Sequence, residues 1–334
     1  MKSYEIILTV LIALAALIGI GYFCCCRLVA KLFTTTFGRI DEENLRKTIQ
    51  NFDDKIASGP LAHRLPMLQA GRAWIAAFPK EQISILSHDG LRLVASLFER
   101  PQDDSAALGL PGYGKTLLLF HGYHSSAAYD FSGACAYYYA LGFRLVLVDQ
   151  RTHGQSQGEY VTFGALEQRD VISWCTRINE RYGSENPILL TGISMGATTV
   201  LLAAGRTDLP QNVIGVIADC GYADAHSELS HVARQYMHLP PFPMMNILCR
   251  QCRRAGFSLD DCSAEHALKN ARIPIFFAHG EQDRFVPPEH THRNAAACAS
   301  RHTVQLVKGA GHGMSYLVDP EHSQALIRQF IESL

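Results

Sequence analysis

The sequence lacks an excess of charge of either sign. Its 334 residues contain 30 lysines and arginines against 31 aspartates and glutamates, so the formal net charge is −1. This balance provides neither a basic surface for nucleic acid nor an acidic tail. The chain also contains no internal repeat and no low-complexity tract. Its length is sufficient for one large α/β domain or two small ones.

The sequence also lacks the cysteine framework of a small secreted domain. Ten cysteines are present, but apart from the run at 24–26 they are scattered, which suits a reducing compartment. Cys249 and Cys252 form a C-x-x-C pair, yet no second pair with zinc-finger spacing follows. A structural zinc site needs four ligands. We therefore expect no metal there, nor at His290 and His292.

What the sequence does contain is one long uncharged apolar run, IILTVLIALAALIGIGYFCCC, from Ile6 to Cys26. As a helix it is long enough to cross a hydrocarbon core of about 30 Å. A cleaved signal peptide is the alternative, but its apolar region normally has about 7–15 residues and ends in a small-x-small cleavage site. We interpret residues 1–27 as an uncleaved transmembrane anchor in the cell membrane.

Basic residues are unevenly distributed around this run. Lys2 alone precedes it, whereas four basic residues follow it: Arg27, Lys31, Arg39 and Arg46. The positive-inside rule therefore favours a cytoplasmic location for the rest of the chain. Acylation of Cys24, Cys25 and Cys26 would add a second anchor. The alternative is that these cysteines are small apolar residues at a helix end.

The remaining chain divides into two parts. Residues 28–80 are helical in character, with the polar amphipathic start DEENLRKTIQNFDDKIA, and we interpret them as a juxtamembrane stalk without catalytic residues. In residues 81–334, QISILSHDGLRLVASLFER predicts a hairpin around Asp89-Gly90. Buried-strand runs then alternate with helices: TLLLFHG, RLVLVDQ, PILLTGI, VIGVIADCG, IPIFFAHG and TVQLVKG. This alternation predicts a parallel sheet covered on both faces, with ligands bound at the carboxyl ends of its strands.

Ser194 lies at one of these strand ends. In ILLTGISMGATTVLLAAG it stands between Gly192 and Gly196, with a strand before it and a helix after it. The G-x-S-x-G elbow in this context lifts a serine hydroxyl clear of the sheet. The alternative is a Gly-Ser turn that only joins a strand to a helix. The flanking elements favour the elbow.

A nucleophilic serine needs a general base, and the base needs an orienting carboxylate. Asp283 follows one later strand in FFAHGEQDRFVP, and His312 follows the next in VQLVKGAGHGMS. Because all three residues come directly after strands, we predict that Ser194, Asp283 and His312 form a catalytic triad. His153 is an alternative base, but it precedes the serine in the chain.

The transition state also needs donors for its developing negative charge. LLLFHGYHSS ends a strand in His121-Gly122, which turns the backbone amide of Tyr123 toward the elbow. The amide of Met195, directly after the nucleophile, is the second predicted donor. We interpret the polar residues of VDQRTHGQSQG as a buttress for this oxyanion loop: Arg151, His153 and Ser156.

These segments, together with IADCGY and GAGHG, resemble the α/β-hydrolase superfamily. They are most similar to bacterial membrane-anchored members related to the prolyl-oligopeptidase-like and serine-aminopeptidase-like branches. The resemblance extends from about Gln82 to the C-terminus. It implies an α/β-hydrolase fold with an eight-stranded, mostly parallel sheet, a triad of Ser194, Asp283 and His312, and no cofactor. One departure is Thr152, which stands where the pattern D-x-R-G-H-G-x-S has glycine.

Substrate choice in this fold resides in the insertion before IPIFF, here residues 223–271, which we interpret as a small helical cap. Its apolar residues either line an acyl pocket or pack the cap onto the body: Tyr236, Met237, Phe242, Met244 and Met245. The cap supplies no acidic pair to hold a peptide amino terminus. We predict a membrane-anchored serine carboxylesterase that forms an acyl-enzyme with short-to-medium acyl esters. A serine peptidase or amidase acting on a short amide, and a non-catalytic membrane scaffold, are the alternatives.

Overall fold

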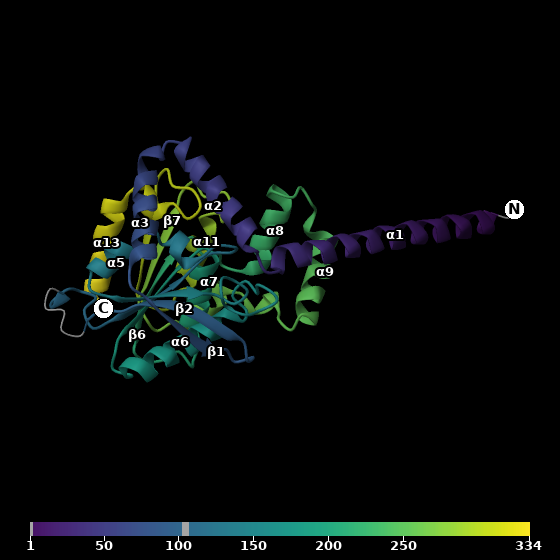
Figure 1. The fold of residues 1–334 in the computed structure, drawn as a ribbon. Helices are drawn as coiled ribbons and strands as arrows, with labels where there is room; N and C mark the ends of the chain where they lie inside the picture. The colour runs from purple at the N-terminus through teal and green to yellow at the C-terminus, as the bar shows by residue number, and fades with distance from the viewer. Residues whose placement is uncertain (1–2, 102–106) are drawn as a thin grey trace.

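The computed structural model describes residues 3–101 and 107–334 of the chain. Four helices precede the sheet: α1 (Ser3–Phe37), α2 (Glu42–Ala57), the short 3-10 helix η1 (Ala62–Arg64) and α3 (Leu65–Ala77). Within the described residues, α1 alone is long and apolar enough to cross a membrane, judged by length and composition. It projects from the body in Figure 1, and the large apolar side chains from Ile7 to Phe23 are exposed. Lys2, which entered the orientation argument, lies outside the described residues.

The last third of α1 belongs to the body. Val29 and Phe37 are each only 1% exposed. Val29 packs against the cap helix α9 (Pro241–Arg254), while the ring of Phe37 lies 4.9 Å from that of Phe163. The Tyr22 hydroxyl also accepts a hydrogen bond of 2.8 Å from Arg250 of α9. α1 is therefore one continuous helix whose first part projects and whose last part packs.

The centre of the molecule is an eight-stranded sheet in the order β1-β2-β4-β3-β5-β6-β7-β8. Only β1 and β2 run antiparallel to their neighbours, and the hairpin between them turns at Asp89-Gly90. The predicted eight-stranded, mostly parallel sheet is thereby confirmed. The strands are β1 (Glu81–Leu86), β2 (Arg92–Phe98), β3 (Thr116–Phe120), β4 (Arg144–Asp149), β5 (Ile188–Ile193), β6 (Val213–Asp219), β7 (Ile275–Gly280) and β8 (His302–Val307).

Helices cover both faces of this sheet, because its strands carry apolar side chains on both sides. One core cluster joins the sheet to α6 (Glu167–Tyr182) and α7 (Met195–Ala204) through Trp174, Ile178 and Val200. The opposite cluster joins it to α3, α5 (Cys135–Ala140) and α13 (Pro320–Glu332). Three further helices complete the layers: α4 (Ala127–Asp130), α11 (Glu289–Ala297) and α12 (Ser315–Val318).

The segment between β6 and β7 is helical, and one of its faces holds α1. It contains α8 (Ala225–Gln235), α9, η3 (Leu259–Asp261), α10 (Ala264–Ala267) and η4 (Leu268–Asn270). Met244 and Ile247 of α9 pack with Val29, whereas Phe242 is 76% exposed. In Figure 1, α9 lies beside the point where α1 leaves the body. The apolar side of α9 therefore forms the contact with the N-terminal helix.

Candidate active site

Ser194 occupies a sharp turn between β5 and α7, with φ 56° and ψ −118°. Two glycines permit this turn. A Cβ on Gly192 would approach the carbonyl oxygen of Gly196 to 2.2 Å, and one on Gly196 would approach the carbonyl oxygen of Phe120 to 2.0 Å. Neither position accepts a side chain. The serine is therefore held in a strained left-handed conformation by backbone packing on either side.

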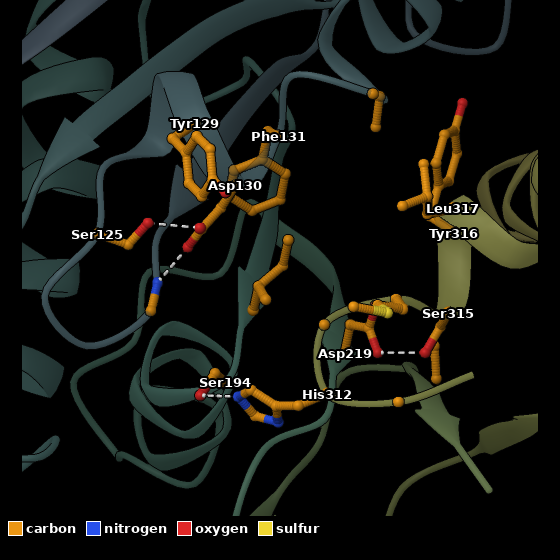
Figure 2. A pocket seen from close by; sticks show the side chains of 18 of the residues that line it. Ser125, Tyr129, Asp130, Phe131, Ser194, Asp219, His312, Ser315, Tyr316 and Leu317 are labelled. Atoms are coloured by element: carbon orange, nitrogen blue, oxygen red, sulfur yellow. Dashed lines mark hydrogen bonds between the residues drawn. The ribbon is translucent and has the colours of Figure 1, made fainter. Parts of the chain in front are cut away.

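Three loops bring a serine, a histidine and an aspartate into a single hydrogen-bonded chain. The Ser194 hydroxyl lies 2.9 Å from His312 Nε2, and His312 Nδ1 lies 2.7 Å from Asp283 Oδ2. Figure 2 shows the contact between Ser194 and His312. The other carboxylate oxygen, Asp283 Oδ1, accepts backbone N–H bonds of 2.9 Å from Phe285 and Val286. This geometry orients the imidazole toward the serine and leaves Asp283 no freedom to rotate.

A second histidine lies against the same carboxylate. His279 is fully buried, with Nε2 3.3 Å from Asp283 Oδ2 and 2.9 Å from the carbonyl oxygen of Val286. Burial acts to lower the pKa of His279, but the hydrogen bonds to Asp283 and Val286 and the nearby carboxylates together outweigh it, and the pKa is raised. Burial acts to raise the pKa of Asp283, but hydrogen bonds from His279 and His312 bring it well below its usual range. The Asp283 carboxyl is therefore ionised. The sequence analysis assigned no role to His279, and its spacing of four residues from Asp283 was the only available signal.

The loop after β3 lies directly against the nucleophile. A Cβ on Gly122 would lie 3.4 Å from the Cβ of Ser194. The Gly122 amide donates a 2.6 Å hydrogen bond to Asp130, whose other oxygen accepts one of 2.5 Å from the Ser125 hydroxyl. Within the described residues, the backbone amides of Tyr123 and Met195 donate to no other protein group. Both amides are thus available to an incoming oxygen atom.

Two buried histidines form hydrogen bonds with the backbone of this loop. His121 Nδ1 donates to the carbonyl oxygen of Gly122 at 2.7 Å, and burial lowers the pKa of His121 to about 4. His153 Nε2 accepts from the His124 amide at 3.1 Å, while its Nδ1 lies 2.9 Å from the carbonyl oxygen of Arg151. Both ring nitrogens of His153 are therefore engaged with backbone groups, which leaves neither available as a base for Ser194.

The loop after β4 completes this support. The Arg151 guanidinium pairs with Asp170 at 2.7 Å and with Asp89 at 3.0 Å. The Ser156 hydroxyl donates to the carbonyl oxygen of Asp149 at 2.5 Å. Thr152 adopts φ 72°, a left-handed conformation that glycine adopts without strain.

A cavity of about 810 Å³ opens in front of Ser194, and part of its wall comes from the N-terminal helices. Phe52 and Lys55 of α2 and Leu68 and Arg72 of α3 line it. Arg72 forms a bidentate pair with Asp53, with N–O distances of 2.6 and 2.7 Å, which ties α3 to α2. The sequence analysis placed no site residue in this segment. The structure places the two helices over the cavity as a roof, named here the α2–α3 roof.

The residues predicted for an acyl pocket in the cap are distributed differently. Tyr236 lines the cavity. Phe242 is mostly exposed, Met244 packs against α1, and Met245 is buried in the cluster that includes Phe37. None of these last three lines the cavity, because the apolar side of α9 is occupied by α1. They are therefore not retained in the proposed pocket.

Two further carboxylates line the cavity near the triad. Asp130 accepts the hydrogen bonds described above, and Asp219 accepts one of 2.8 Å from the Ser315 hydroxyl. Burial raises the pKa of both groups despite these bonds. Figure 2 shows both side chains beside the open space, together with Tyr316 and Leu317.

One group of possible metal ligands occurs among the described residues. Donor atoms of Cys220, Asp283 and His312 lie within 4.8 Å of one another. However, Asp283 and His312 are bonded to each other, and burial raises the pKa of the Cys220 thiol well above its ordinary value. A protonated thiol beside an engaged histidine fits a hydrogen-bonded triad better than a cation site.

The comparisons with known proteins agree with this geometry. Esterase Pf2001 of Pyrococcus furiosus superimposes with a TM-score of 0.57 at 19% identity, covering 77% of this chain and 92% of the esterase. Acetyl xylan esterase 1 of Thermoanaerobacterium gives 0.53 at 15%, covering 80% and 92%. A puromycin-hydrolyzing peptidase of Mycobacterium tuberculosis gives 0.54 at 16%, covering 76% and 40%. These likenesses show that the chain shares the fold of these esterases and of the peptidase.

The sequence comparisons match a smaller part of the chain than the structural comparisons do. Residues 114–257 match the family described as serine aminopeptidase, S33. The uncharacterized protein YqkD of Bacillus subtilis is 25% identical over 195 residues, which amount to 58% of this chain and 64% of YqkD. The match thus spans less than two thirds of that relative.

Proposed function

We propose that the protein is a membrane-anchored serine carboxylesterase that cleaves esters of short to medium acyl chains. The observation that carries this proposal is the Ser194–His312–Asp283 hydrogen-bonded chain at a largely apolar cavity. The elbow glycines Gly192 and Gly196 position the nucleophile. No residue of this mechanism requires a metal or cofactor.

The mechanism follows from the geometry. His312 Nε2 takes the hydroxyl proton as Ser194 Oγ attacks the ester carbonyl carbon, and Asp283 stabilises the resulting imidazolium. The amides of Tyr123 and Met195 donate to the oxyanion. When the tetrahedral intermediate collapses, the alcohol leaves with the proton from His312. Water then gives its proton to His312, attacks the acyl-enzyme and releases the acid, which regenerates Ser194.

The N-terminal helix supports the membrane part of the proposal. Its exposed large apolar side chains run from Ile7 to Phe23, and Arg27 and the exposed Leu28 follow. Arg250, from the distant cap helix α9, hydrogen-bonds Tyr22 at this same level. Tyrosine and arginine are typical of the interface between a membrane and water. More basic residues follow the apolar run than precede it, which favours a cytoplasmic catalytic domain. A C-terminal reporter that is active only in the periplasm tests this orientation, and signal from it would contradict the proposal.

The first prediction tests the esterase activity directly. The full-length protein in detergent micelles is assayed with p-nitrophenyl esters of increasing acyl length, beside Ser194→Ala. We expect hydrolysis by the wild type and a loss of roughly four orders of magnitude or more in kcat for the variant, since the triad acts as a unit. Equal rates for the two proteins on every ester would contradict the proposal and favour a non-catalytic scaffold.

A serine peptidase or amidase is the second candidate, and the carboxylates of Asp130 and Asp219 favour it. A carboxylate in a cavity is suited to a protonated amine, and residues 114–257 match a serine aminopeptidase family. Against it, both carboxylates already accept hydrogen bonds from the protein. A higher kcat/KM for aminoacyl p-nitroanilides than for any p-nitrophenyl ester would select this candidate.

A further inference from the structure

The cavity in front of Ser194 continues below the protein surface along one face of the sheet. Ile193, Ile217 and Ala278 line it, and the last two are no more than 7% exposed. The strand register explains this arrangement. Thr191 pairs with Ile217, and Ile217 pairs with Phe276, so cavity-lining residues of three strands form one row.

A second row lies nearer the nucleophile. It consists of Ile193, Asp219, Ala278 and Gln305, which are paired in register from β5 to β8. Side chains two residues apart on a strand share a face, so both rows form one floor. Crossing from β5 to β8 covers three strand spacings of about 4.8 Å, so the floor is about 14 Å wide.

The side chains opposite this floor are mainly apolar. Ile327 of α13, Leu317 of α12 and Tyr138 of α5 also line the cavity. Ile327 belongs to the same buried cluster as Ile217 and Phe276. The space therefore lies between the sheet and its helices, whereas the cap contributes only Tyr236 near the entrance.

Two pairs of polar side chains that line this space are already bonded to each other. Gln305 Nε2 donates to Ser323 Oγ at 3.3 Å, and Ser315 Oγ donates to Asp219 Oδ1 at 2.8 Å. An apolar ligand therefore leaves these groups with the partners they have, and no new unsatisfied group arises. A polar ligand would have to compete with these bonds.

We propose that this space holds the acyl chain of an unbranched, medium-chain fatty acyl ester. Ile217, Ala278 and Ile327 set the longest chain that the enzyme accepts. This inference rests on the proposed function, because it requires the acyl carbon to sit at Ser194. The chain runs from Ser194 across the floor toward β8, and the alcohol part of the ester faces the α2–α3 roof. The volume of about 810 Å³ is toward the upper end of the roughly 300–1,000 Å³ typical of small-molecule pockets.

The experiment measures kcat/KM for p-nitrophenyl esters from acetate to palmitate with the full-length protein in detergent. Ala278→Leu and Ile217→Phe fill the floor, and Ile327→Ala lengthens the space. We expect the ratio of kcat/KM for laurate to that for acetate to fall by about tenfold or more in the filled variants. Ile327→Ala moves the preferred ester to a longer chain. Phe242→Ala, in the exposed part of the cap, is the control and leaves the ratio unchanged.

A second measurement needs no variant and keeps the test decisive if a filled variant does not fold. Linear alcohols of increasing length are used as competitive inhibitors of acetate ester hydrolysis by the wild type. Ki falls with each added methylene until the space is full, and then stops falling. A Ki that does not depend on chain length contradicts the proposed acyl site.

The outcomes separate this inference from the function on which it rests. If Ser194→Ala hydrolyses every ester as the wild type does, the proposed function fails and the acyl site fails with it. If short esters are hydrolysed through Ser194 but the laurate-to-acetate ratio is the same in all variants, the acyl chain binds elsewhere. In that case only this inference is overturned.

Discussion

Ser194, Thr152 and Cys220 have positive φ values of 56°, 72° and 50°, although none is glycine. All three lie directly after strands, at the edge of the sheet where the site is formed. A left-handed conformation costs an L-residue roughly 1–2 kcal/mol, and such strain persists where the surrounding structure holds it in place. The strained serine has a hydroxyl that bonds to His312 at the cavity, whereas the strained threonine has a buried hydroxyl without a partner in the described residues.

The strain at Thr152 leads to a stability prediction. We expect Thr152→Gly to be more stable than Thr152→Ala by about 1 kcal/mol, because only glycine adopts this φ without a Cβ clash. Both variants lose the same hydroxyl and methyl group, so the comparison isolates the backbone. Urea unfolding of the two proteins in identical micelles measures the difference. Equal midpoints would show that the loop relaxes away from the left-handed conformation.

The buried pair of His279 and Asp283 leads to a prediction about pH. The pKa of His279 is raised in the folded state, so the stability gained from its charge is complete below about pH 6.5 and is lost as pH rises through the folded-state pKa. The free energy of unfolding of the wild type should therefore exceed that of His279→Gln by more near pH 6 than near pH 9. Chemical unfolding across this range measures the difference.

The matched control for that measurement is His63→Gln at an exposed position on η1. This variant shows how much of a pH trend comes from the loss of a histidine at an exposed position. A difference for His279→Gln that is constant, or smaller near pH 6 than near pH 9, would show that the pKa of His279 is not raised in the folded protein. Asp283 has the opposite dependence on pH. Because its pKa is lowered, its contribution to the free energy of unfolding is present above about pH 4 and is lost at lower pH.

The hydrogen-bonded residues at Ser194 could be predicted from the sequence because each lies at the end of a strand or in the loop that follows one. Parallel strands end at one edge, so sequence position alone places Ser194, Asp283 and His312 near each other. His279 and Asp130 carried no such signal. Their contacts depend on side-chain directions within loops, and an aspartate or a histidine near a turn is common in any chain.

At the scale of elements, α3 approaches the loop before α5 more closely than any side chain would permit. A Cβ on Gly71 would lie 1.7 Å from the backbone oxygen of Ser132. We expect Gly71→Ala to cost about 1–3 kcal/mol of unfolding free energy, as overpacking does. It should also lower kcat/KM for short esters, because α3 carries Leu68 and Arg72 in the cavity wall.

Gly133→Ala is the matched control for that prediction. A Cβ there would meet its nearest neighbour, the terminal carbon of Met67, at an ordinary 3.5 Å. Thermal unfolding and ester hydrolysis of both variants test this prediction. A Gly71→Ala protein as stable and active as Gly133→Ala would mean that α3 is not held in this close position.

The cap helix α9 shows that an apolar sequence pattern does not determine which partner its residues contact. The sequence marks Met244 and Met245 as apolar residues on a helical segment, and either an acyl group or another helix satisfies that pattern. The structure places α1 against them. Because α1 is more than 200 residues earlier in the chain, no local feature of α9 specifies this partner.

At the scale of the whole molecule, α1 consists of an exposed part and a packed part, and matched substitutions separate them. Phe37 is 1% exposed and Phe23 is 63% exposed. We expect Phe37→Ala to lower the free energy of unfolding by about 3–5 kcal/mol, as for other buried phenylalanines, and Phe23→Ala to leave it nearly unchanged. Thermal unfolding of the full-length proteins in detergent measures both. Similar midpoints would show that α1 does not pack on the body.

The sheet could be predicted as a whole, whereas the α2–α3 roof could not. Alternating apolar runs and helices specify a covered parallel sheet regardless of details. The roof depends on a few long-range contacts, such as Leu68 with Leu317 and the Arg72–Asp53 pair. The polar amphipathic start at residue 41 predicts a helix but not what its apolar side covers.

The contact between the roof and α12 has a consequence for the timing of synthesis. Arg64 reaches the carbonyl oxygen of Val318, 254 residues further along the chain, and Leu68 packs with Leu317. The ribosome synthesises Arg64 and Leu68 long before Leu317 and Val318. His312 is also synthesised late. A nascent chain would therefore contain Ser194 before it contains His312 or a closed cavity. The hydrogen bond between Ser194 and His312 can form only once translation has passed the last strand.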